Sequence, residues 1–66
     1  MTKFTVSDGV DYREIVAANS AAAATEYVRQ VEGMVEDEAP YELTVSHGDT
    51  VVGEFRVSEA GSVRPA

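Results

Sequence analysis

The chain contains no cysteine and no tryptophan, and it has a single histidine. Disulfides are therefore excluded, and so is a structural zinc site, which takes cysteine and histidine ligands. A domain of 66 residues buries only about 60% of the surface that its unfolded form exposes. Without a covalent or metal cross-link, its stability depends on close packing or on association with another chain.

The sequence also lacks a long apolar run. No stretch approaches the ~18 apolar residues that a membrane-spanning helix needs. Residues 1–4 show no basic region leading into an apolar segment, as a signal peptide would. We therefore expect a cytoplasmic protein that makes no contact with membranes, and for a phage-encoded chain this is the cytoplasm of the host cell.

Basic residues are scarce, because five Lys and Arg stand against twelve Asp and Glu, for a net charge of −7. Residues 30–55 contain no Lys or Arg at all. Phosphate groups of nucleic acid are bound chiefly by these two residue types, so direct nucleic-acid binding is excluded. An acidic field attracts basic protein surfaces and accelerates the encounter with them. Solubility and adaptation to high salt remain open as alternative reasons for the acidity.

The residue types that catalysis requires are equally sparse. His47 lies in a predicted turn with Asp49 two residues on, where a histidine is typically a solvated polar residue. One helix against one sheet leaves little room for a cleft between two carboxylates in different environments. The alternating Asp and Asn of a calcium-binding loop are absent. We therefore expect a protein that is not an enzyme, with no cofactor and no dedicated metal site.

The first eighteen residues predict a hairpin of two strands. Phe4 and Val6 alternate with polar residues, and the run 10–18 is rich in β-branched and aromatic residues. A three-residue turn over 7–9 sets Val6 across from Val10 and keeps apolar residues opposite one another. In this register the second strand turns Val10, Tyr12 and Val16 toward the core, and Asp11, Arg13, Ile15 and Ala17 away from it.

A helix is predicted after this hairpin. Asn19 and Ser20 are favourable N-cap residues and precede four alanines, which have the highest helix propensity. The helix is expected to end between Glu32 and Glu36. Its apolar residues recur at the spacing of one helix face. That face consists of Ala21, Ala24, Val28, Val31 and Val35, with Tyr27 and Met34 beside it.

A second hairpin follows the helix. Residues 41–45 alternate between apolar and polar, and in residues 51–57 the positions 51, 53, 55 and 57 recur with the same period of two. A three-residue turn over 47–49 pairs Leu43 with Gly53 and keeps the apolar side chains on one face. The inner faces of the two strands are then Tyr41, Leu43 and Val45, and Val51, Gly53, Phe55 and Val57.

These elements predict an α+β fold. It consists of a four-stranded antiparallel sheet in the order β-β-α-β-β, with one helix packed on one face. A single domain over residues 1–58 is expected, and residues 59–66 carry no pattern and are predicted to be a mobile C-terminal tail.

Several acidic residues are predicted to lie where local electrostatics disfavour them. Acids near a helix C-terminus cost about 0.3–1 kcal/mol each, and the predicted register places Glu42 across from Glu54, a destabilising like-charge pair. A surface maintained against local stability indicates recognition by a basic partner. The predicted partner-binding residues are Glu32, Glu36, Asp37, Glu38, Glu42 and Glu54.

The run 13–24, a strand that leads directly into a capped alanine-rich helix, is followed by a hairpin in a small, acidic, cysteine-free chain. This layout resembles that of small phage-encoded anti-CRISPR proteins. The resemblance implies an inhibitor, acting as a nucleic-acid mimic, that binds the basic DNA-contacting surface of a CRISPR effector complex and blocks target recognition. One alternative is a structural or regulatory interaction module, monomeric or weakly homodimeric, that uses an apolar sheet face or an exposed edge strand. Another is a salt-adapted housekeeping domain.

Overall fold

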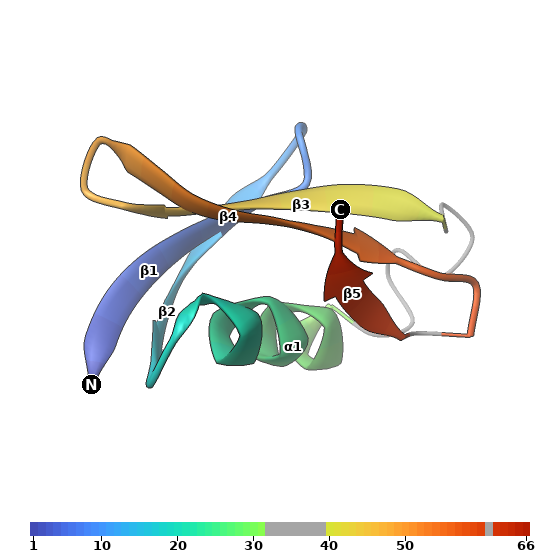
Figure 1. Ribbon diagram of the computed structural model, residues 1–66, viewed down its shortest axis with the longest axis horizontal. Helices are drawn as coiled ribbons and strands as arrows, with labels where there is room; N and C mark the ends of the chain where they lie inside the picture. The colour runs from blue at the N-terminus through green and yellow to red at the C-terminus, as the bar shows by residue number, and fades with distance from the viewer. Residues whose placement is uncertain (32–39, 61) are drawn as a thin grey trace.

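The computed structural model describes residues 1–31, 40–60 and 62–66. Its elements are β1 (Thr2–Ser7), β2 (Tyr12–Ala17), α1 (Ser20–Gln30), β3 (Tyr41–His47), β4 (Thr50–Val57) and β5 (Val63–Pro65). The strands form one antiparallel sheet in the order β2-β1-β3-β4-β5, and α1 lies along one face of it (Figure 1). The predicted α+β fold with an antiparallel sheet and a covering helix is confirmed, but the sheet has five strands and not four.

β5 is the strand that the sequence did not predict. Val63–Pro65 pairs with β4, with Val63 across from Val57, and the Ser58 N–H donates to the Ser62 carbonyl at 2.9 Å in the connecting turn. These three residues fall in the segment that was predicted to be a mobile tail. A strand this short that contains a proline has no period-two pattern to recognise. Proline is tolerated here because β5 is at the edge of the sheet, where a missing backbone N–H breaks no ladder hydrogen bond.

The core lies between α1 and the inner face of the sheet, which is the face that α1 covers. Tyr27 is at the centre of the helix face, with 1% of its surface exposed. The buried face of α1 is rotated from the predicted one, because Ala23 is buried and Ala21 is exposed. The buried residues are Phe4, Val6, Ile15, Ala17, Ala23, Ala24, Tyr27, Val31, Leu43, Val45, Phe55 and Val57.

The start of α1 agrees with the prediction. Asn19 is the N-cap, and its side-chain oxygen accepts a hydrogen bond from the Ala22 N–H at 2.8 Å. The helix ends at Gln30, with Val31 as C-cap, and not between residues 32 and 36. The β-branched Val31 leaves helical geometry while its side chain is buried in the core, so tertiary packing outweighs the helical periodicity that continues in the sequence.

The β1–β2 turn differs from the prediction and reverses the two faces of β2. Residues 8–11 form a four-residue turn, which sets Val6 across from Arg13 instead of Val10. This is a shift of three residues, and any odd shift moves every side chain of a strand to the opposite face. The predicted core residues Val10, Tyr12 and Val16 are therefore exposed, and Ile15 and Ala17 are buried.

Asp8 explains the longer turn. Its Oδ1 accepts hydrogen bonds from the backbone N–H groups of Val10 at 2.8 Å and Asp11 at 2.7 Å, and its own N–H donates to the Asp11 carbonyl at 3.1 Å. Gly9 takes a left-handed conformation with φ of 96°. Charge-assisted hydrogen bonds to a carboxylate are stronger than neutral ones, so this Asx turn is favoured over the three-residue turn that the apolar pattern suggested.

Replacing Asp8 with alanine should therefore destabilise the protein by about 1–2 kcal/mol at neutral pH. The Asp11 N–H, the strongest influence, holds the pKa of the Asp8 carboxyl below its usual value of 3.8. The stability that the carboxylate supplies is thus fully present above that value, and it is lost as the pH falls through the lower pKa of the folded state. Urea unfolding of the wild type and Asp8→Ala at neutral pH and at pH about 2 should show a difference that shrinks in acid. An equal difference at both pH values would contradict this account.

Beyond its turn and the bulge next to it, the second hairpin keeps its predicted faces but changes its pairs. The turn has two residues, 48–49, and Val52 is an extra residue that forms a β-bulge between the pairs Ser46–Val51 and Val45–Gly53. As a result Leu43 lies across from Phe55 and not from Gly53. The shift is of two residues, so the inward-facing residues of β3 stay inward.

Candidate functional site

Two of the six predicted partner-binding residues lie in the described part of the chain. Glu42 on β3 and Glu54 on β4 are both exposed, next to residues that are buried against α1. Because side chains alternate along a strand, both lie on the outer face of the sheet, the face opposite α1. The other predicted residues, Glu32, Glu36, Asp37 and Glu38, lie outside the described residues.

The predicted like-charge pair of Glu42 and Glu54 does not form. Glu42 lies across from Arg56, with 3.4 Å between the Glu42 Oε2 and the Arg56 Nη2, and Glu54 lies across from Thr44. The two-residue shift of the hairpin explains both changes. An exposed ion pair is worth about 0–1 kcal/mol, so Glu42 is weakly stabilised where the sequence predicted an electrostatic cost. That argument for a site at Glu42 was wrong.

Ion pairs neutralise three acids of the described surface, including Glu42. Lys3 contacts Glu14 at 3.3 Å, Arg29 contacts Glu26 at 2.7 Å, and Arg56 contacts Glu42 at 3.4 Å. Arg64 on β5 lies across from Arg56, and Arg13 donates to the Gln30 side chain at 3.4 Å. The outer face around Arg56 is therefore mixed in charge and not uniformly acidic.

The turn end of the β3–β4 hairpin has a different character. Asp49 and Glu54 are exposed there, and neither forms an ion pair with a Lys or Arg of the described residues. Val51 and Val52 are 56% and 43% exposed, respectively. Val51 was predicted to face the core, but it lies across from Ser46 of the outer face, next to the bulge. We call Asp49, Val51, Val52 and Glu54 the hairpin-tip surface.

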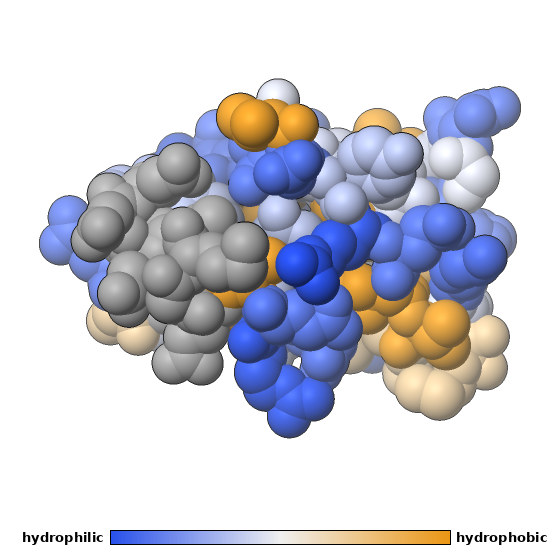
Figure 2. Space-filling view, turned by 180° about the vertical axis from the view of Figure 1, so that it is seen from behind, coloured by the Kyte–Doolittle hydropathy of each residue, from blue (hydrophilic) through white to orange (hydrophobic). Residues whose placement is uncertain are grey.

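Small hydroxyl side chains occupy the centre of the outer face. Thr5 on β1 lies across from Ser46 on β3, Ser7 lies across from Thr44, and all four are half-buried. Their short side chains leave a low polar area between the exposed apolar residues of β2 and those of β4. Seen from the side, with the sheet above the helix, the molecule shows hydrophobic residues in separate groups with hydrophilic ones between them (Figure 2). The exposed apolar surface is thus divided into separate groups.

Side chains that could serve catalysis or metal binding do not cluster among the described residues. His47 is exposed, with its ring centroid 6.0 Å from that of Phe4. Burial, together with the negative charge of Asp8, raises the pKa of Tyr27 to about 12, but both groups belong to the core and the β1–β2 turn. Within residues 1–31, 40–60 and 62–66, no three His, Asp or Glu side chains lie together as metal ligands would. No helix of these residues is long and apolar enough to cross a membrane.

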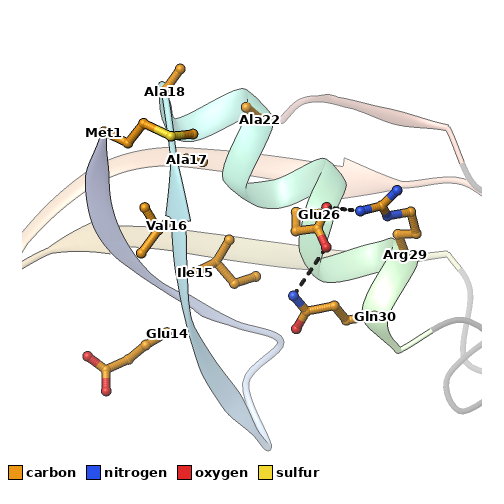
Figure 3. Close-up of a pocket in the computed structure, with 10 residues that line it drawn as sticks. All are labelled: Met1, Glu14, Ile15, Val16, Ala17, Ala18, Ala22, Glu26, Arg29 and Gln30. Carbon is orange, nitrogen blue, oxygen red and sulfur yellow. Dashed lines mark hydrogen bonds and ion pairs between the residues drawn. The ribbon is translucent and has the colours of Figure 1, made fainter.

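A groove of about 530 Å³ runs between the outer edge of β2 and α1 (Figure 3). Residues 15–18 form one side of it, and Ala22, Glu26 and Arg29 form the other. Ile15 points across it toward α1, and Glu26 is joined to Arg29 and Gln30 by hydrogen bonds of 2.7 and 3.2 Å. Sequence analysis did not predict this groove because it assigned Ile15 to the outer face.

Comparison of the chain with family models, with curated proteins and with solved structures found no match.

Proposed function

We propose that this chain is a non-enzymatic protein-binding domain whose hairpin-tip surface binds a partner with a basic surface. One observation carries the proposal: the tip combines two acids that no described cation neutralises with two exposed valines. Carboxylates steer a basic partner and form charge-assisted hydrogen bonds to its Arg and Lys. Valines supply the apolar contact that the centre of an interface needs.

We further propose that the partner surface is one that normally binds nucleic acid, such as the DNA-contacting surface of a CRISPR effector complex. The chain would then act as a cytoplasmic inhibitor that occupies this surface. The net charge of −7 and the absence of Lys and Arg from residues 30–55 support this choice. The acids at 36–38 belong to the same stretch of sequence. Glu42 contributes less than Glu54, because Arg56 already neutralises it.

The test is displacement of labelled target DNA from a purified CRISPR effector complex, followed by fluorescence anisotropy. The wild-type chain should displace the DNA, and the displacement should weaken as salt is added, because exposed charges are screened. A double variant with Asp49→Lys and Glu54→Lys should lose about ten-fold or more in apparent affinity, which corresponds to about 1.4 kcal/mol. Reversal of Glu36, Asp37 and Glu38 to Lys should weaken displacement as well.

The matched control is a double variant with Asp11→Lys and Glu59→Lys, which changes the net charge equally. β1 and β3 are antiparallel, so the 8–11 turn lies at the opposite end of the sheet from the 48–49 turn, and Glu59 follows the end of β4 that pairs with Tyr41. This control should retain wild-type displacement. Equal losses in both double variants would assign the effect to net charge and reject the hairpin tip. If neither added salt nor charge reversal changed the displacement of DNA, the proposal of a partner with a basic surface would be rejected.

A further inference from the structure

The two edges of the sheet are protected to different degrees. β5 has three residues, ends in Pro65 and carries Arg64, and a short strand, a proline and a charge all discourage the addition of another strand. β2 has six residues, contains neither proline nor glycine, pairs with β1 without a bulge, and carries two charges of opposite sign, Arg13 and Glu14. No strand of the described residues covers its other side. β2 therefore presents a regular row of backbone donors and acceptors.

β2 is also apolar on both faces. Ile15 and Ala17 are buried against α1, while Tyr12 and Val16 point to the outer face and are 70% and 59% exposed, respectively. Cross-strand pairs of aromatic and β-branched residues stabilise a sheet. Tyr12 and Val16 therefore give the outer face of β2 apolar side chains that a strand added at this edge can pair with.

The helix side of the groove is complementary in charge to a second copy of itself. Ala22 is small and allows another helix to approach closely, and Glu26 and Arg29 lie one turn apart with 2.7 Å between the Glu26 Oε1 and the Arg29 Nη2 (Figure 3). A two-fold axis between Glu26 and Arg29 sets each of them across from the oppositely charged residue of the second copy.

The same axis passes close to Glu14. The Arg13 side chain donates to the Gln30 side chain at 3.4 Å, so the start of β2 lies near the end of α1. The midpoint between Glu26 and Arg29 lies about 4 Å back along the helix from Gln30, at a rise of about 1.5 Å per helical residue. This distance corresponds to about one residue of a strand, which rises about 3.3 Å per residue. Glu14 therefore lies within about one residue of the position on β2 that is level with the midpoint, and the cross-strand pairs decide the register.

We propose that a second copy of this chain binds this edge, with the two β2 strands antiparallel across a two-fold axis at Glu14. This inference does not rest on the proposed function. In this register the two-fold axis generates two equivalent pairs, each with Tyr12 of one copy across from Val16 of the other. Pairs of an aromatic and a β-branched residue stabilise a sheet. Glu14 meets Glu14 of the second copy, and Lys3, which lies 3.3 Å from each Glu14 within its own chain, offsets that repulsion.

The neighbouring registers that keep both outer faces aligned are less favourable. An axis at Ile15 places Glu14 across from Val16 of the second copy. An axis at Arg13 places the two Arg13 residues opposite each other and Tyr12 across from Glu14 of the second copy. Neither register pairs Tyr12 with Val16, and the second brings like charges together without a described acid to offset them.

Disulfide cross-linking tests the register, because the wild type has no cysteine. Directly opposite residues of antiparallel strands have Cα atoms about 4.5–5.5 Å apart, within the range that a disulfide spans. Glu14→Cys should form a covalent dimer under mild oxidation. Glu54→Cys, an exposed residue of the same face on β4, should remain monomeric. Cross-linking of Glu54→Cys as fast as that of Glu14→Cys would overturn the assignment to β2.

Sedimentation velocity from micromolar to millimolar protein tests the association itself. The wild type should show a dimer whose fraction rises with concentration and with salt, because salt screens the repulsion between two chains of charge −7. Val16→Lys should weaken association about ten-fold or more, since it removes both Tyr12–Val16 contacts and adds an edge lysine. Val51→Lys, at a matched 56% exposure on β4, should leave it unchanged. A wild type that stays monomeric at millimolar concentration, or equal losses in both variants, would overturn the proposal.

The proposed partner binding and the proposed self-association can be tested independently of each other. Val16→Lys should weaken self-association and leave the displacement of DNA by the hairpin tip intact, and Val51→Lys should do the reverse. Salt also acts in opposite directions, because it weakens binding to a basic partner and strengthens self-association.

Discussion

Replacing Tyr27 with alanine should leave most of the protein unfolded at room temperature. Truncating a large buried aromatic side chain costs about 3–5 kcal/mol. A core of this size rarely supplies more than about 3–5 kcal/mol of net stability, and Tyr27 is among the largest side chains that are fully buried. The loss is therefore comparable to the whole free energy of unfolding, and no disulfide is present to compensate for it.

Circular dichroism and urea unfolding of Tyr27→Ala and Tyr12→Ala measure this difference. Tyr12 is the matched control, since it is the same residue type on the outer face, and its replacement should change the stability of the monomer by less than about 0.5 kcal/mol. Tyr27→Phe separates the ring from its hydroxyl and should cost about 1 kcal/mol, because it removes the interaction with Asp8. A folded Tyr27→Ala, or equal losses in the two alanine variants, would contradict the assignment of the core.

These two tyrosines illustrate what the sequence could predict. The period-two and helical patterns predict four of the five strands and the helix, and Asn19 marks where the helix begins. The pattern alone does not decide which face of β2 is buried, because that strand is apolar on both faces. Tyr12 was assigned to the core for this reason, and Tyr27 only to its border.

The register depends on local turn chemistry that hydrophobic alternation does not capture. The hydrogen bonds of one carboxylate, that of Asp8, lengthen the first turn and reverse β2. The two-residue turn at 48–49 and the extra residue Val52 in β4 each shift the second hairpin by one residue, and together they give Glu42 a cation as neighbour. A two-residue shift preserves the faces of the strands but changes the cross-strand partners, so the core of β3 was predicted correctly and the like-charge pair was not.

The candidate surfaces follow from the same register. Val51 and Val16 were assigned to the core, and both became exposed apolar residues in the structure. They belong to different groups on the outer face, because the half-buried hydroxyl residues of β1 and β3 lie between them. This separation is why we assign partner binding to the hairpin tip and self-association to β2.

Ile15 and Val16 are neighbours in sequence and should respond in opposite ways to the same substitution. Ile15→Asp places a carboxylate among the apolar side chains between β2 and α1, where 3% of the Ile15 surface is exposed. An unpaired buried charge is among the few single changes that cost more than about 4 kcal/mol, so this variant should not fold at neutral pH. Val16→Asp places the same carboxylate in water and should fold, with a change below about 0.5 kcal/mol in the monomer.

Proton NMR spectra of the two variants provide the measurement, because dispersed amide and methyl signals report a packed core. Lowering the pH should partly restore Ile15→Asp, since a protonated carboxyl costs less to bury than a charged one. A dispersed spectrum for Ile15→Asp together with a collapsed one for Val16→Asp would restore the three-residue turn and return Val16 to the core. In that case β2 would have one polar face, and the reason for placing a second copy at its edge would disappear.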